Sequence, residues 1–216
     1  HPLLDGNGNA IEKRDTESIA MLNQVSGEYR GQFFDDRLTT TIGVRAPFLY
    51  RKLDNYCFTR NAGGATSSFA CAFGATGAAY AAANPYLALN PATGQPSGAA
   101  LPQTRTYTYN AVLPNVGLTY KLPHAGETFF NYSKGFGAPQ TTALYPSFYY
   151  PQGTAGVAPS PEKTDNFDLG YRYNDRKLSG QLDLWYTHFT NRLGQAYDII
   201  TQNTIYSNLG TVDRYG

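Results

Sequence analysis

Apolar residues occupy nearly every second position on both sides of a polar stretch at 174–177. Successive side chains of a β-strand point to opposite faces, so the pattern predicts two strands, each with one apolar and one polar face. The apolar faces hold Phe167, Leu169, Tyr171 and Tyr173 before the turn, and Leu178, Leu182, Leu184 and Tyr186 after it.

A four-residue turn at 174–177 predicts the register of this hairpin. Leu169 pairs with Leu182 on the apolar face, and Asp168 lies opposite Asp183 on the polar face. Two carboxylates facing each other in a dry core would be costly, so the polar face must be wet. Either a half-exposed sheet or a membrane barrel with a water-filled interior satisfies this requirement.

The same alternation predicts seven strands in all, and the connections between them alternate strictly in length. A change of phase at Leu113-Pro114 predicts a bulge in the third strand. Short connections lie at 31–36, 122–126 and 174–177, and long ones at 50–104, 137–160 and 194–204. This order is typical of an all-β, antiparallel transmembrane barrel with short periplasmic turns and long extracellular loops.

Composition supports a barrel and argues against several other classes. Charged residues make up 15% of the chain and aromatic residues 14%, which is poor in charge for a soluble domain. The net charge of +1 gives no electrostatic case for nucleic-acid binding. No apolar run reaches the roughly 20 residues of a membrane-spanning helix.

The first long connection contains both cysteines, Cys57 and Cys71. Their spacing is unlike that of metal ligands, so we expect a disulfide and therefore an oxidising compartment. Two free buried thiols are the alternative.

Candidate catalytic chemistry is sparse, so we expect neither an enzyme nor a cofactor. The three histidines are scattered, which predicts no metal site, and no phosphate-binding glycine loop occurs. Asp168 and Asp183 could imitate the paired carboxylates of a glycosidase, but a wet barrel wall accounts for both residues.

Several phrases, in order along the chain, resemble the barrel of TonB-dependent outer-membrane receptors. Most of the chain outside the long loops takes part in the resemblance. The phrases are Gly27-Glu-Tyr29, the run from Asp36 to Arg45, Leu113 to Tyr120, Asn131 to Pro139, Pro161 to Gly170 and Asn208 to Gly216.

The resemblance implies a 22-stranded barrel, plugged by an N-terminal domain, that imports scarce nutrients such as iron–siderophore complexes. Residues 1–216 show no plug, energy-coupling segment or final strand ending in an aromatic residue. We therefore expect about seven strands of one barrel domain, towards its C-terminal part, in a Gram-negative outer membrane. The implied partners are outer-membrane lipid, a small ligand such as a metal–siderophore complex, and TonB, reached through the missing N-terminal part.

Two sets of residues are candidates for ligand binding. Aromatic residues of the long loops could offer flat faces to a ligand, or they could pack the loops and meet lipid. Polar residues could line the lumen, or simply link the strands. The loop set is Phe69, Phe73, Tyr80, Tyr86, Tyr145, Phe148, Tyr149 and Tyr150, and the lumen set is Arg30, Arg45, Asp168, Arg172 and Asp183.

Two other functions fit the pattern. A passive porin would share the barrel but would lack a plug. A secreted β-sandwich binding module with aromatic loops would dissolve without detergent.

Overall fold

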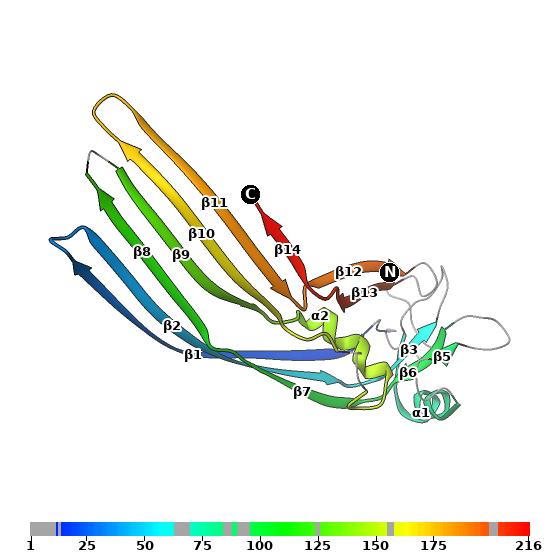
Figure 1. Ribbon diagram of the computed structural model, residues 1–216. Coiled ribbons are helices and arrows are strands. Elements are labelled where there is room, and N and C mark those ends of the chain that lie inside the picture. The colour runs from blue at the N-terminus through cyan, green and yellow to red at the C-terminus, as the bar shows by residue number, and fades with distance from the viewer. Residues whose placement is uncertain are drawn as a thin grey trace.

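The computed structural model describes residues 12, 14–62, 70–83, 88–89, 96–123, 126–154, 158–198 and 203–216. Its main feature is a large, curved antiparallel sheet with the order β1-β2-β8-β9-β10-β11-β14, and β7 also pairs with β2 (Figure 1). The strands are β1 (Thr16–Phe33), β2 (Leu38–Asn55), β7 (Gln103–Asn110), β8 (Leu113–Leu122), β9 (Gly126–Gly137), β10 (Glu162–Asn174), β11 (Ser179–Thr190) and β14 (Val212–Tyr215).

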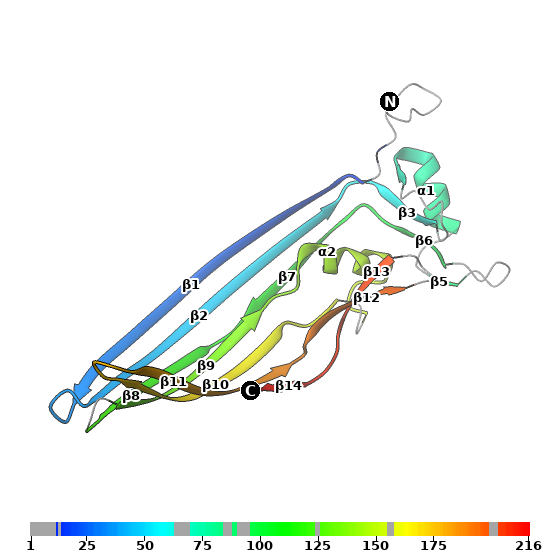
Figure 2. The same ribbon diagram turned by 90° about the horizontal axis from the view of Figure 1, so that it is seen from above.

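The order of the sheet confirms the predicted antiparallel wall with seven strand positions. Within the described residues, β7 and β8 occupy the third position together, because both pair with β2. The three short connections lie at one end of the sheet, and the long ones lie at the other end (Figures 1 and 2). The described strands thus form part of a barrel wall.

The predicted register of the β10–β11 hairpin is wrong by two residues. Asp183 pairs with Gly170, and Asp168 pairs with Trp185. The turn occupies residues 175–178, where the Asp175 N–H donates to the Leu178 carbonyl at 2.9 Å. A shift of two residues leaves every side chain on its predicted face, because the side-chain period of a strand is two.

The predicted bulge at Leu113-Pro114 is also wrong. β7 and β8 follow one continuous register along β2, from Leu53↔Arg105 to Arg45↔Leu113. We call the face of the sheet that carries Arg45 the inner face, and the face that carries Ile42 the outer face. The apolar pattern changes phase because Tyr107 and Tyr109 lie on the inner face. There Tyr107 packs under a loop instead of facing outwards.

The first long connection contains secondary structure of its own. It forms a four-stranded sheet of order β4-β3-β6-β5. The strands are β3 (Phe58–Ala62), β4 (Ala70–Ala72), β5 (Ala88–Leu89) and β6 (Pro96–Ala100), accompanied by helix α1 (Gly74–Ala83). Cys57 and Cys71 form the predicted disulfide in this unit, and both are buried.

The other two long connections are also structured. The second contains helix α2 (Thr141–Leu144) and the 3-10 helix η1 (Tyr145–Tyr149). The third contains a separate hairpin of β12 (Leu193–Asp198) and β13 (Asn203–Asn208). The strand predicted from Ile205 therefore belongs to this hairpin, and β14 is the last strand of the wall. No helix in the described part of the chain is long and apolar enough to cross a membrane.

The two faces of the wall differ in chemistry as the alternation predicted. On the outer face large apolar side chains stay exposed, among them Leu169 at 53% and Leu184 at 57%. On the inner face Leu113 and Phe129 are buried at 5% among polar neighbours. An apolar outer face and a crowded polar inner face are the inverse of a soluble domain.

Candidate functional site on the inner face

Strand pairing places all five predicted lumen residues on one face of the sheet, the inner face, and that this face lines a lumen remains a prediction. Arg30 lies opposite Thr41, Arg45 opposite Leu113, Asp168 opposite Asn131, Arg172 opposite Glu127 and Asp183 opposite Gly170. They are spread over four strands and do not form one cluster. Their contact with a ligand remains a prediction.

Arg172 belongs to a compact network across β9, β10 and β11. Its guanidinium lies 4.2 Å from the centre of the Phe129 ring, and it donates to Glu127 at 3.1 Å and to Gln181 at 3.3 Å. The Phe129 ring lies directly over Gly170, where a Cβ atom would collide with it. The network links neighbouring strands, which is the structural alternative considered for this residue.

The second long connection folds back onto the inner face of β2 and β7. Arg105 of β7 donates from both Nη atoms, to the carbonyl oxygens of Ser147 and Tyr150, each at 2.6 Å. The Tyr107 hydroxyl lies 2.7 Å from Ser147 Oγ. We call residues 140–150 the inner platform, since these contacts hold the segment against the wall.

A small apolar core fixes the inner platform in place. Leu53, Ala100, Leu144 and Phe148 are almost fully buried together, and Arg105 covers the Phe148 ring at 5.0 Å. The Tyr145 hydroxyl reaches further and donates to the Glu17 carbonyl of β1 at 2.9 Å. Burial raises the pKa of Tyr145 above its usual value. The platform therefore contacts both β7 and β1.

The predicted loop aromatics divide into three groups. Phe148 is 2% exposed, so in this conformation it packs the platform and offers no face to a ligand. Tyr145, Tyr149 and Tyr150 are half-buried on the platform, and Phe73 is exposed beside α1. Phe69 and Tyr86 lie outside the described residues, as does the side chain of Tyr80. Ligand binding by any of them remains a prediction.

A cavity of about 430 Å³ lies where β1, β2, β8 and β9 run side by side. From the inner face Glu28, Arg45, Asn115 and Ser133 contribute to its lining. These side chains offer one acid, one base, an amide and a hydroxyl. Such a mixed lining favours water or a polar group without selecting one charge.

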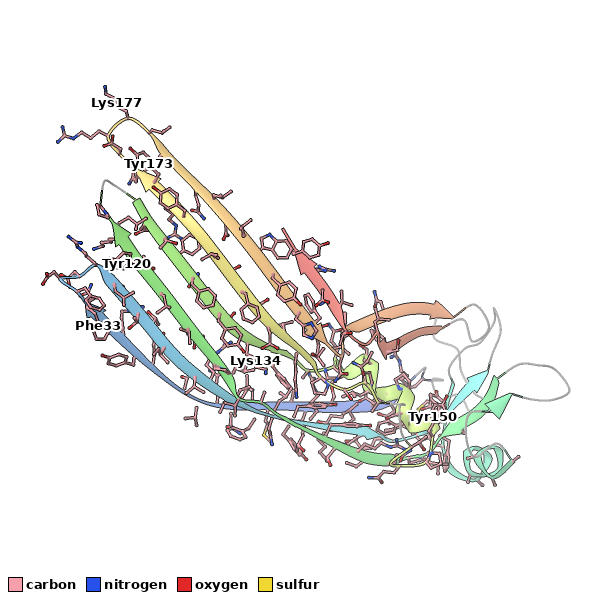
Figure 3. The ribbon with its side chains drawn as sticks, in the orientation of Figure 1. Phe33, Tyr120, Lys134, Tyr150, Tyr173 and Lys177 are labelled. Atoms are coloured by element: carbon pink, nitrogen blue, oxygen red, sulfur yellow. A yellow bond between two sulfur atoms is a disulfide. The ribbon has the colours of Figure 1, made fainter. Side chains whose placement is uncertain are left out.

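Towards the end of the sheet with the long loops, polar and charged side chains replace the apolar ones on the outer face. There Tyr132 and Tyr186 donate to Asp165 and Asp213 at 2.7 and 2.8 Å, and Lys134 and His188 pair with the same carboxylates. At the opposite end Phe33, Tyr120 and Tyr173 stand beside the short turns (Figure 3). An apolar band bounded by aromatic rings and then by charges fits the profile of a bilayer.

Beyond this band, Tyr56 links the loop unit to β1. Its hydroxyl donates to Glu17 at 2.7 Å, and this hydrogen bond is the main reason that the pKa of Tyr56 rises to about 12. Its backbone N–H donates to the Asp15 carbonyl. Hydrogen bonds therefore fix the start of the small sheet to the wall.

Sequence reasoning missed the residues that build the platform, above all Arg105, Tyr107 and Ser147. Their contacts join residues 40 or more positions apart, which alternation along one strand cannot reveal. One signal was present, namely the change of apolar phase between Tyr109 and Val116. It marked the place where the inner face becomes covered.

Comparison with known proteins agrees with this geometry. The family described as "TonB dependent receptor-like, beta-barrel" matches residues 4–216. The fold is similar to a solved structure described as the copper transporter OprC, with TM-score 0.58 and 17% identity over 92% of this chain. It is also similar to the ferric-catecholate import receptor Fiu from E. coli K12, with TM-score 0.59 and 15% identity over 98% of this chain.

The chain spans only 26% and 27% of the lengths of those two structures. At such low identity the likeness concerns the fold alone. No curated protein matches the sequence.

Proposed function

Because this chain belongs to the TonB-dependent receptor-like β-barrel family, we propose that it is part of an outer-membrane receptor that imports a scarce small-molecule nutrient. An iron–siderophore complex is the ligand class that we propose first, with TonB as the source of energy. The receptor works by binding and transport, without covalent chemistry.

One observation supports the proposal above all: the wall has an apolar outer face and a polar inner face, the reverse of a soluble domain. Exposed Leu169, Leu182 and Leu184 cover the outer face of the β10–β11 hairpin, while Asp168, Arg172 and Asp183 lie on the opposite face. A wall of this kind is stable with lipid outside and water inside. The inner platform adds a folded segment within the extracellular mouth, where a selective receptor needs contacts.

The second support is the family relationship. One similar structure is named as an import receptor for a ferric catecholate and another as a copper transporter. Both names describe transport of a metal or of a metal complex. We infer uptake of a metal complex for this chain by analogy with these proteins.

Uptake of radioactive iron tests the proposal. The complete receptor is expressed in a Gram-negative strain that lacks its own siderophore receptors, and catecholate, hydroxamate and carboxylate complexes of iron are supplied one at a time. We expect uptake of at least one complex, and we expect that uptake to disappear in a matched strain without TonB.

Two results would contradict the proposal. Uptake that continues without TonB would indicate a passive porin. A receptor that takes up none of the iron complexes would exclude iron–siderophore import as its function.

A further inference from the structure

Arg51 of β2 and Tyr109 of β7 form a pair of donors on the inner face, outside every network described above. Arg51 lies opposite Tyr107 in the register, and Tyr109 lies two residues further along the same strand. Both residues are half-buried, so they stay in reach of the lumen.

One polar atom of each residue has no hydrogen-bond partner in the described part of the chain. These atoms are Arg51 Nε and the Tyr109 hydroxyl oxygen, and both are buried. Buried donors are satisfied in almost all native structures, since leaving one unpaired is costly. Two such atoms at diagonal positions of neighbouring strands indicate an acceptor that comes from outside these residues.

The local charge specifies what kind of acceptor fits. Among the residues that the structure describes, the partners of the Nη atoms of neighbouring Arg105 are backbone carbonyls, and none of them is a carboxylate that would neutralise this second guanidinium. The nearby carboxylates, Asp54 and Glu17, stand on the outer face by the parity of their strands. This part of the inner wall therefore carries an excess of positive charge, which favours an anion.

The two donors are accompanied by parallel aromatic rings. The rings of Tyr107 and Tyr109 are nearly parallel, with an interplanar angle of 5° and centroids 6.4 Å apart. A ring in this orientation can stack with a planar group, and the guanidinium can hold the oxygen atoms attached to that group.

We propose that Arg51 and Tyr109 form a subsite for an oxyanion, a carboxylate or phenolate, carried on a planar aromatic group of the imported ligand. The inference rests on the proposed function and adds a chemical class to it. The subsite lies next to the inner platform, whose Ser147 holds the hydroxyl of Tyr107.

Binding of two small probes to the complete receptor in detergent tests the subsite. Salicylate carries the anionic aromatic group, and salicylamide is its neutral counterpart of nearly the same shape. We expect salicylate to bind more tightly by calorimetry or ligand-observed NMR. We expect Arg51→Gln to weaken salicylate binding by about tenfold or more and Tyr109→Phe by about fivefold, with little effect on salicylamide.

Matched variants separate the subsite from general effects. Lys52→Gln removes a positive charge at the next residue on the outer face, and Tyr120→Phe removes an exposed outer-face hydroxyl. Both should bind salicylate like the unmodified receptor. Retention of the folded band in unheated gel electrophoresis shows that each variant still folds.

Three results would overturn the proposal. They are equal binding of the two probes, a loss in Lys52→Gln as large as that in Arg51→Gln, and no binding of salicylate at all. In the last case the acceptor belongs to another part of the receptor. Selective salicylate binding by a receptor that imports no iron complex would leave the subsite in place and reject the proposed ligand class.

Discussion

Arg105 shows how a single side chain can hold a loop inside a barrel mouth. Its planar guanidinium reaches two carbonyl oxygens of the inner platform at once and also covers the ring of Phe148. Lysine has the charge but not the fork of donors, so it cannot replace these contacts together.

We therefore expect Arg105→Lys to loosen the inner platform without unfolding the wall. The lost hydrogen bonds are worth about 1.5 kcal/mol or more, which corresponds to a roughly tenfold larger equilibrium constant for opening. Hydrogen exchange of residues 145–150 measures this opening, and Thr106→Ser on the opposite face serves as the control. Unchanged exchange in Arg105→Lys would show that the apolar core alone holds the platform.

At this residue scale the sequence predicted faces well and partners poorly. As alternation predicted, Asp168 and Arg172 share one side of the sheet and Leu184 lies on the other, because the period of a strand is local information. It could not show that Phe148 is buried, because the residues that cover it, Leu53 and Ala100, come from distant parts of the chain.

Among the elements, the position of a hairpin turn decides the register of its two strands. The β10–β11 connection could close at 174–177 or at 175–178, and both choices keep apolar residues on one side. The structure adopts the second, with Asp175 and Leu178 hydrogen bonded. The sequence therefore predicted the strands and their faces, while the exact cross-strand pairs depended on one short turn.

The disulfide of the small loop sheet gives a prediction about elements. Cys57 directly precedes β3 and Cys71 lies in β4, and the disulfide joins positions 14 apart in the sequence. Closing a loop of this length stabilises a fold by about 3 kcal/mol. We expect Cys57→Ser/Cys71→Ser to lose protection from protease in residues 56–102.

The wall should remain intact in the same double variant, because within the described residues β3–β6 form a sheet of their own. A folded band in unheated gel electrophoresis would show this independence. Loss of that band would show instead that the small sheet is needed for the wall to fold.

On the scale of the whole molecule, the distribution of surface chemistry makes the membrane assignment testable. Ile42 is 52% exposed on the outer face of β2, and its neighbour Thr41 lies on the inner face. In the proposed orientation Ile42→Arg places a charge in lipid at a cost of about 2–4 kcal/mol, whereas Thr41→Arg places it in water.

Folding of the complete receptor into lipid vesicles, followed by urea titration, measures this difference. We expect Ile42→Arg to lower the midpoint clearly and Thr41→Arg to change it little. Equal effects of the two substitutions would contradict the inverted wall.

The length of the first hairpin has a consequence for how the cell surface is seen from outside. β1 and β2 each contain 18 residues, or about 60 Å of extended chain at ~3.3 Å per residue. A bilayer core is about 30 Å thick, so even tilted strands must stand well clear of it. If the long loops face the outside of the cell, as proposed, an antibody would contact the disulfide-bonded sheet before it reached the bilayer. We therefore expect antibodies raised against intact cells to recognise that sheet first.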